Sequence, residues 1–193
     1  MERKQHITKE FDNKEEFELN WVEASAHPIG AVGLWNSMIK IIKMAKEKGD
    51  DIIVICEDDH YFTENYSPKL LFKEVTEAYI QGAEVLSGGI GGFGQAIPPG
   101  YHRYKVDWFW CTQFIVIYNR FFDKMLDYSF QNTDTADGVI SKLATNIMVI
   151  YPFISEQKDF GYSDVTQSNM EQQGKIREHF ARANKHMKSI SLK

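Results

Sequence analysis

Three consecutive carboxylates, Glu57-Asp58-Asp59, follow the apolar run 52–56 and are the residues best placed to do chemistry. A mostly β-branched run between a turn at 49–51 and a cluster of charge is typical of a strand buried on both faces. Ligands of open α/β sheets bind beyond the carboxyl ends of the strands, and carboxylate oxygens suit Mg²⁺ or Mn²⁺. We therefore predict a divalent-cation site at the end of this strand; the alternative is a solvated acidic turn.

A second pair of carboxylates, Asp134 and Asp137, stands where the sequence predicts a helix that ends near Ala144. The structural interpretation is capping, with Asp134 as the N-cap and an acid three residues on, where the helix dipole favours negative charge. The functional interpretation uses the same geometry, because a carboxylate fixed at a helix start is a well-oriented general base. The sequence leaves both interpretations open.

Glycine-rich and aromatic segments supply further candidates for ligand contact. Five glycines within residues 88–94, Gly91 among them, exclude a regular helix or strand interior there. The segment is either a mobile loop at the mouth of the site or a plain connector, and its spacing is not that of a Walker P-loop. Trp108, Phe109 and Trp110 are either a platform for a sugar or a base or, as we favour, part of the core.

Composition excludes several classes of protein. The chain has 193 residues, of which 43% are hydrophobic and 25% charged, with a net charge of −5, so we expect one sizeable core and no nucleic-acid partner. No apolar run approaches the length of a membrane span, and Cys56 and Cys111 resemble buried thiols of a reducing compartment. We predict a cytoplasmic protein whose basic tail makes at most peripheral contact with the inner face of a membrane.

Strands and helices alternate along the chain and must position these residues. Predicted strands cover 17–24, 52–56, 84–88, 112–118 and 147–151, and predicted helices cover 34–48, 67–82 and 120–128, with a further helix after Asp134. The alternation predicts one α/β, Rossmann-like domain with a mostly parallel sheet flanked by helices. We place this domain at residues 1–165 and a basic, helical C-terminal tail at 166–193.

In their order, several of these pieces resemble glycosyltransferase family 25, the group that includes bacterial lipooligosaccharide galactosyl- and glucosyltransferases and collagen galactosyltransferases. The matching pieces, within roughly residues 17–165, are Gly30-Ala31-Val32-Gly33 opening a helix, the apolar strand into Glu57-Asp58-Asp59, a strand with Thr112-Gln113, the helix near Asp134 to Asp137, and a strand into Tyr151-Pro152 followed by Gln157 and Ser163-Asp164. The acidic triplet after a buried strand is the most specific of them.

The resemblance implies a GT-A fold, a nucleotide-sugar donor of the UDP-galactose or UDP-glucose type, and a Mn²⁺ or Mg²⁺ ion. It also implies that a hexose is transferred, with inversion, to a glycan or lipooligosaccharide acceptor. On this chain the triplet becomes the Asp-X-Asp-like motif. Asp59 then binds the metal, Glu57 lies on the donor side or in the metal shell, and Asp58 lies on the donor side.

Transfer to an acceptor hydroxyl needs a general base on the far side of the sugar carbon, for which Asp137 is the first candidate and Asp134 the second. Five further residues are candidates for contact with the acceptor or for the loop around it. They are Gly91, Trp108, Gln113, Ser163 and Asp164.

The family's first strand, which carries an Ile-Asn-Leu-like segment and a nucleotide-holding arginine, is expected to be missing here. The chain starts about where that strand should end, and Arg3 is the expected remnant of the basic, donor-binding position. Two other functions therefore stay open. One is a non-catalytic relic of the fold that binds a glycan or a partner protein. The other is a metal-dependent phosphoesterase, since an acidic cluster at a strand end also serves phosphoryl chemistry.

Overall fold

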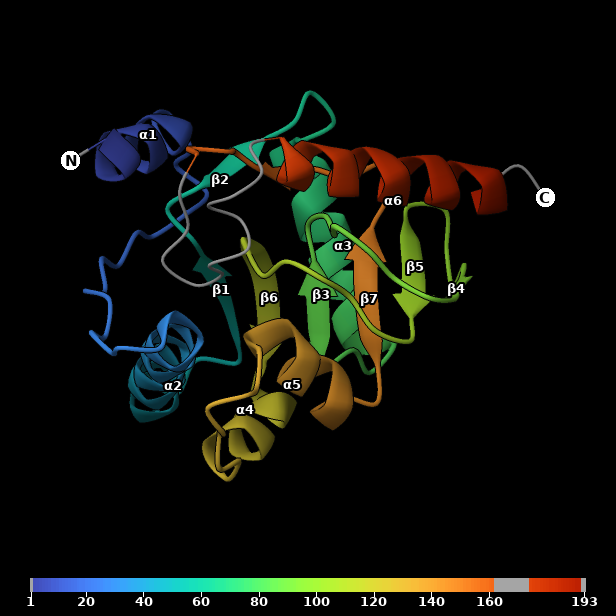
Figure 1. Cartoon of the computed structure of the whole chain (residues 1–193). Helices are drawn as coiled ribbons and strands as arrows, with labels where there is room; N and C mark the ends of the chain where they lie inside the picture. Colours follow the sequence, from blue (N-terminus) through green and yellow to red (C-terminus); the bar gives the residue numbers. More distant parts are fainter. Residues whose placement is uncertain (1, 162–173, 192–193) are drawn as a thin grey trace.

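The structure, a computed structural model, describes residues 2–161 and 174–191 (Figure 1). Its strands are β1 (Ile52–Cys56), β2 (His60–Phe62), β3 (Val85–Ser87), β4 (Ala96–Ile97), β5 (Arg103–Val106), β6 (Phe114–Tyr118), β7 (Ile147–Ile150) and β8 (Ser155–Gln157). Its helices are α1 (Glu2–Glu10), α2 (Gly30–Lys48), α3 (Pro68–Ile80), α4 (Asn119–Leu126), α5 (Ala136–Leu143) and α6 (Lys175–Ser191).

A six-stranded sheet in the order β1-β6-β3-β7-β5-β4 carries the core, and β2 and β8 form a separate two-stranded sheet. The predicted α/β class with flanking helices is confirmed, but the sheet is mixed. Among the described residues only β3 and β7 pair in parallel, so the predicted predominance of parallel pairs is wrong. The reason is that no helix connects β3 to β6, and strands joined without a crossover helix run antiparallel.

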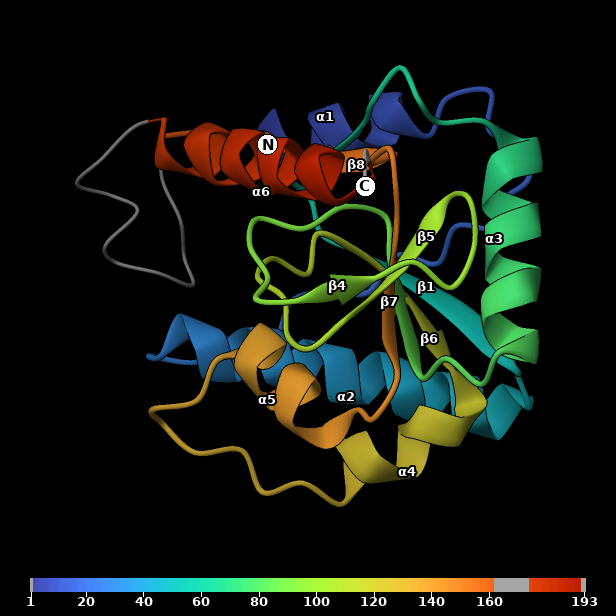
Figure 2. The ribbon, with the colours of Figure 1, turned by 90° about the vertical axis from the view of Figure 1, so that its right-hand side faces the viewer.

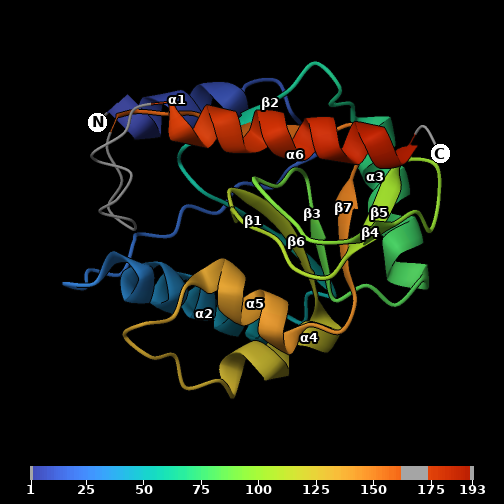
Figure 3. The same cartoon turned by 45° about the vertical axis from the view of Figure 1, so that its right-hand side comes forward.

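Strand direction decides which side chains meet at one edge. β1, β3 and β7 run the same way, so their carboxyl ends share an edge with the amino end of β6. Figures 1 and 3 show α1, β2 and α6 lying over this end of the sheet. The elements that lie over this end of the sheet therefore come from both ends of the described chain.

Helices cover both faces of the sheet (Figure 2). On one face, side chains of α2, α4, α5 and α6 form a core with the sheet, and on the other face side chains of α1 and α3 form a second core. α2 shows why the sequence folds this way: Trp35, Met38 and Ile42 follow helical spacing and are all buried. The helix ends where Gly49 adopts φ 79°, a left-handed conformation that glycine tolerates without strain.

Two features of the predicted secondary structure need correction. Residues 17–24 form no strand, because Leu19 and Trp21 are exposed at 45% and 57% and only the side chain of Phe17 packs against a core. The strands β2, β4, β5 and β8 were not predicted, since each has only two to four residues and lacks an extended apolar run. The start of α3 agrees with the prediction, with Ser67 Oγ accepting a hydrogen bond from the Leu70 N–H.

The predicted helical tail corresponds to α6, whose residues Phe180, Ala183 and Met187 are buried against the sheet. The proposed boundary at residue 165 lies outside the described residues, so the division of the chain stays a prediction. Within residues 2–161 and 174–191, no helix combines the length and the apolar character that a membrane span needs. The cytoplasmic location also stays a prediction.

A buried ion pair connects β5 to α3 and gives a test of the fold. Arg103 is fully buried and pairs with the equally buried Glu74, and it also donates to Glu77 at 3.2 Å. Arg103→Met leaves Glu74 buried without its cation, so we expect the free energy of unfolding to fall by about 3–5 kcal/mol in urea titrations. Lys73→Met, which removes only the exposed Lys73–Glu77 pair, should cost less than about 1 kcal/mol. Equal losses in the two variants would contradict the assignment.

Candidate functional site

The acidic triplet lies directly after β1, in the turn that leads into β2. The Glu57 N–H donates to the Gln113 carbonyl at 2.9 Å, which holds the start of the triplet beside the start of β6. The His60 N–H then donates to the Glu57 carbonyl at 3.2 Å and closes the turn. The sequence places the carboxylates here because the apolar run ends at Cys56 and the chain must leave the core.

The side chain of Glu57 contacts the segment that leads into β6. Its Oε1 accepts a hydrogen bond from the Thr112 hydroxyl at 2.5 Å. Burial and the neighbouring charge of Asp59 raise the pKa of Glu57 to about 8, although the Thr112 hydrogen bond acts in the opposite direction. Burial and the nearby negative charge therefore both favour the protonated form of this carboxyl.

Asp59 is the most buried member of the triplet, with 5% of its surface exposed. Its Oδ2 accepts hydrogen bonds from Gln157 Nε2 at 2.8 Å and from Arg3 Nη1 at 3.3 Å. Its Oδ1 is also buried but has no hydrogen-bond partner among the described residues. Burial raises the pKa of Asp59, and the contacts with Gln157 and Arg3 oppose that rise. One carboxylate oxygen is thus fixed, and the other is a buried acceptor without a partner among the described residues, which calls for an explanation.

Arg3 reaches the triplet from α1. Its Nη1 also donates to Asp58 Oδ1 at 2.8 Å, and its guanidinium lies 5.1 Å from the ring centroid of Phe160. α1 is held over the sheet by the buried side chain of Ile7 and by a 2.8 Å hydrogen bond between His6 Nε2 and the His60 carbonyl. A cation therefore lies against two of the three carboxylates.

Asp137 belongs to the same cluster of charges. Its Oδ2 accepts from the Cys111 N–H at 3.2 Å and its Oδ1 from the Gly138 N–H at 2.8 Å. The negative charge of Asp137 also contributes to the raised pKa values of Glu57 and Cys111. Cys111 adopts φ 77°, and such a conformation in a residue other than glycine is enriched at functional sites.

The prediction that Asp134 caps the next helix is wrong. Thr135 is the N-cap of α5 and accepts a hydrogen bond from the Gly138 N–H. Asp134 Oδ2 instead accepts from the Gln131 N–H at 2.8 Å and from the Tyr128 hydroxyl at 3.1 Å, which fixes the turn before the helix. Both residue types cap helices well, so the sequence alone did not distinguish them.

Gln113 and the glycine-rich segment are packed closely where the main sheet meets β8. Gln113 is buried and its Nε2 donates to the Gly89 carbonyl at 2.9 Å and to Ser155 Oγ at 3.2 Å. A side chain on Gly89 would come within 1.9 Å of the Ser155 carbonyl oxygen, and one on Gly91 within 2.7 Å of Cys111 Sγ. Of the two alternatives for residues 88–94, the structure favours a close-packed connector over a mobile loop.

The remaining predicted residues are distributed between core and surface. Phe109 is buried, as the core interpretation expects, but Trp110 is 47% exposed and Trp108 is half-buried. Ser163 and Asp164 lie outside the described residues. Sequence reasoning gave no role to Thr112 or Gln157, whose contacts with Glu57 and Asp59 bridge elements distant in the chain.

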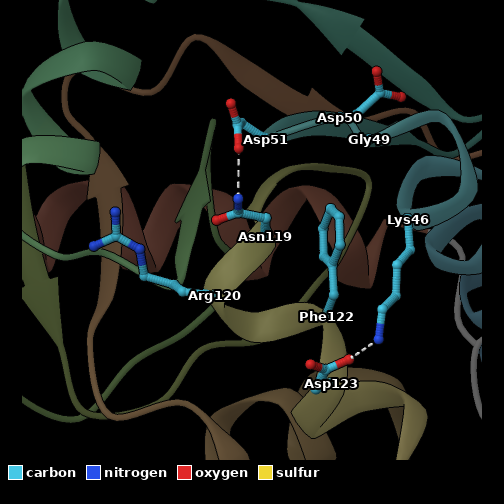
Figure 4. A pocket seen from close by; sticks show the side chains of 8 residues that line it. All are labelled: Lys46, Gly49, Asp50, Asp51, Asn119, Arg120, Phe122 and Asp123. Carbon is cyan, nitrogen blue, oxygen red and sulfur yellow. Dashed lines mark hydrogen bonds and ion pairs between the residues drawn. The ribbon is translucent and has the colours of Figure 1, made fainter.

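A separate pocket of about 410 Å³ opens at the amino end of β1, away from the triplet. Figure 4 shows its lining, which consists of Lys46, Gly49, Asp50, Asp51, Asn119, Arg120, Phe122 and Asp123. Lys46 pairs with Asp123, and Asn119 Nδ2 donates to Asp51 Oδ1 at 2.6 Å. Because these polar groups partner one another, we assign the pocket no ligand.

Comparison with known proteins supports the fold. No protein-family model and no curated protein sequence matches the chain. The crystal structure of A197 from STIV has a TM-score of 0.51 at 16% identity, over 73% of this chain and 72% of that one. UDP-glucose pyrophosphorylase, apo and complexed with UDP-glucose, gives TM-scores of 0.45 and 0.48 at 10% identity, over 80% and 96% of this chain and 61% and 74% of theirs. The similarity to A197 supports the fold alone, and the two matches with TM-scores under 0.5 carry no argument.

The raised pKa of Glu57 predicts how stability depends on pH. The folded state binds more protons than the unfolded state between the ordinary pKa of 4.5 and the folded value of about 8, so this contribution to stability is lost as the pH rises through 8. Glu57→Gln mimics the protonated side chain. We compare the unfolding free energies of the variant and the wild type by urea unfolding. Between about pH 6 and about pH 9 the difference should change in favour of the variant by on the order of 1–3 kcal/mol, because only the wild type loses stability over this range.

The exposed Glu64→Gln is the matched control for this measurement, because its side chain points to solvent. It should follow the wild-type pH profile throughout. A Glu57→Gln profile parallel to that of the wild type would show that Glu57 titrates normally.

Proposed function

We propose that the chain is a glycosyltransferase that moves a hexose, with inversion, from a UDP-sugar of the galactose or glucose type to a glycan or lipooligosaccharide acceptor. One observation carries the proposal: Asp59 is buried at the end of β1 with Oδ2 fixed by Gln157 and Arg3, while Oδ1 has no partner among the described residues. The resemblance of the triplet to the Asp-X-Asp-like motif of glycosyltransferase family 25 supports it.

A Mn²⁺ or Mg²⁺ ion fits the donor set at this position. Asp59 Oδ1 is a buried hard oxygen without a partner in residues 2–161 and 174–191, and the Glu57 carboxyl lies in the same cluster. Among the described residues no group of three His, Cys, Asp or Glu side chains is placed to hold an ion. Such ions are commonly held by one or two carboxylates together with substrate phosphates. When bound, the ion would offset the charge of the diphosphate and stabilise the departing nucleotide.

The chain's own residues supply the other roles. Arg3 lies against Asp58 and Asp59, and in this proposal its guanidinium orients the diphosphate. Asp137 serves as the general base, because the Cys111 and Gly138 N–H groups fix its carboxylate at the start of α5. In this proposal the acceptor hydroxyl gives its proton to Asp137 as its oxygen attacks the sugar carbon.

A second function, a non-catalytic protein that binds a glycan or a partner, is favoured by one observation. The ion pairs of Arg3 with Asp58 and Asp59 already balance much of the charge of the triplet, as a purely structural network would. The phosphoesterase alternative needs several more metal ligands, and no observation on the described residues favours it.

Ligand-dependent melting tests the proposed function. We expect UDP-glucose or UDP-galactose with Mn²⁺ to raise the melting temperature, with a stabilisation of about 2–3 kcal/mol at a ligand concentration 100 times Kd. Asp59→Asn should abolish the rise, whereas Asp127→Asn, an exposed acid on α4's C-terminal side, should retain it. No rise with any UDP-sugar, with or without Mn²⁺, would contradict the proposal. A rise without UDP release in the presence of glycan acceptors would favour the non-catalytic binder.

A further inference from the structure

Two tryptophans between β5 and β6 have no part in the site described so far. Trp110 is 47% exposed and Trp108 is half-buried, and their ring centroids lie 5.1 Å apart at an interplanar angle of 48°. Paired, solvent-accessible indoles are a large apolar surface, and such surfaces commonly mark binding sites.

The backbone holds both indoles in place. A side chain on Gly92 would come within 2.7 Å of the Trp110 ring, and one on Gly94 within 2.7 Å of Trp108 Nε1, so bare backbone lies against each indole. The Trp110 N–H donates to the Gly92 carbonyl at 3.1 Å. Asp107 Oδ1 accepts from the N–H groups of Gly94, Gln95 and Trp108 at 3.1, 2.9 and 2.9 Å. The surface is therefore preorganised, which lowers the entropic cost of binding.

This surface adjoins the charged cluster. Trp110 immediately precedes Cys111, whose N–H donates to Asp137, and the next residue, Thr112, donates to Glu57. Trp110 is therefore one residue away from the backbone N–H that holds the Asp137 carboxylate.

The surrounding polar groups indicate the kind of ligand. The carboxylates of Asp107 and Asp137 can accept hydrogen bonds. The ring of His179, on α6, lies edge-on to Trp110 with a centroid distance of 5.6 Å, and a hydrogen bond connects it to Arg182. A neutral ring with many hydroxyls satisfies acceptors and donors together and places its C–H face on an indole. A phosphate at this position would face two carboxylates.

We propose that Trp110, supported by Trp108, is the platform on which the neutral sugar ring of the acceptor stacks, with a hydroxyl directed to Asp137. The acceptor role rests on the proposed function, whereas the sugar platform itself rests on the geometry of the two indoles and of the polar groups around them. The ligand class is a neutral hexose or a glycan that ends in one.

Indole N–H signals in ¹H–¹⁵N NMR spectra test the platform directly. The chain's other tryptophans are internal controls, since Trp21 is 57% exposed outside this surface and Trp35 is buried. We expect titration with methyl β-galactoside or lactose to shift the Trp108 and Trp110 signals saturably and to leave those of Trp21 and Trp35 in place. Phe substitutions one at a time assign the four signals. No saturable shift, or equal shifts at Trp21, would overturn the proposal, and so would shifts with UDP but not with sugars.

Variants at Trp110 give a second test that separates this proposal from the proposed function. Trp110→Ala should weaken sugar binding about tenfold and Trp110→Phe less, with Phe72→Ala, an exposed aromatic on α3, as the control that changes nothing. In the glycosyltransferase, Trp110→Ala should raise the KM for acceptor and leave the UDP-sugar melting shift unchanged. Sugar binding at Trp110 without any UDP-sugar melting shift would retain the platform and reject the transferase. Unchanged sugar binding in folded Trp110→Ala would reject the platform.

Discussion

The buried carboxylate of Asp59 is the interaction on which the rest of the candidate site depends. A buried negative charge is stable only when it is paired and hydrogen-bonded. Here the partners are Gln157, from the small β2–β8 sheet, and Arg3, from the N-terminal helix. These contacts fix both elements over the end of the main sheet. Among the described residues they leave the second oxygen of Asp59 without a partner, and this is the atom at which we propose that a metal ion binds.

The reversed direction of β6 matters for the site as much as for the fold. Because β6 runs antiparallel to β1, its amino end lies beside the triplet. This orientation delivers Thr112 to Glu57 and brings Cys111, with its N–H on Asp137, to the same edge. A parallel β6 would have placed Tyr118 there instead. The antiparallel direction of β6 therefore brings the carboxylates of the β1–β2 turn and of α5 to the same edge of the sheet.

The glycine-rich segment allows two kinds of close approach, because glycine has no side chain. At Gly89 the missing side chain lets the Ser155 backbone approach closely, which joins the two sheets. At Gly92 and Gly94 it lets indole rings lie against the backbone. Close approach, rather than mobility, explains why glycine recurs in this segment.

Local pattern was enough to predict elements whose stability depends on residues nearby in the chain. The apolar run of β1, the helical spacing in α2 and the Ser67 cap of α3 all belong to this class, and so does the position of the triplet at a strand end. Local pattern could not predict the direction of the strands or the partners of the carboxylates, because both depend on contacts between residues that are distant in the sequence. Arg3 and Gln157 meet Asp59 from 56 and 98 positions away, respectively. The sequence by itself determined which carboxylates stand at the end of β1. Only the tertiary structure decided which of them is buried, which have raised pKa values and which oxygen has no partner among the described residues, because burial and contacts with distant residues set those properties.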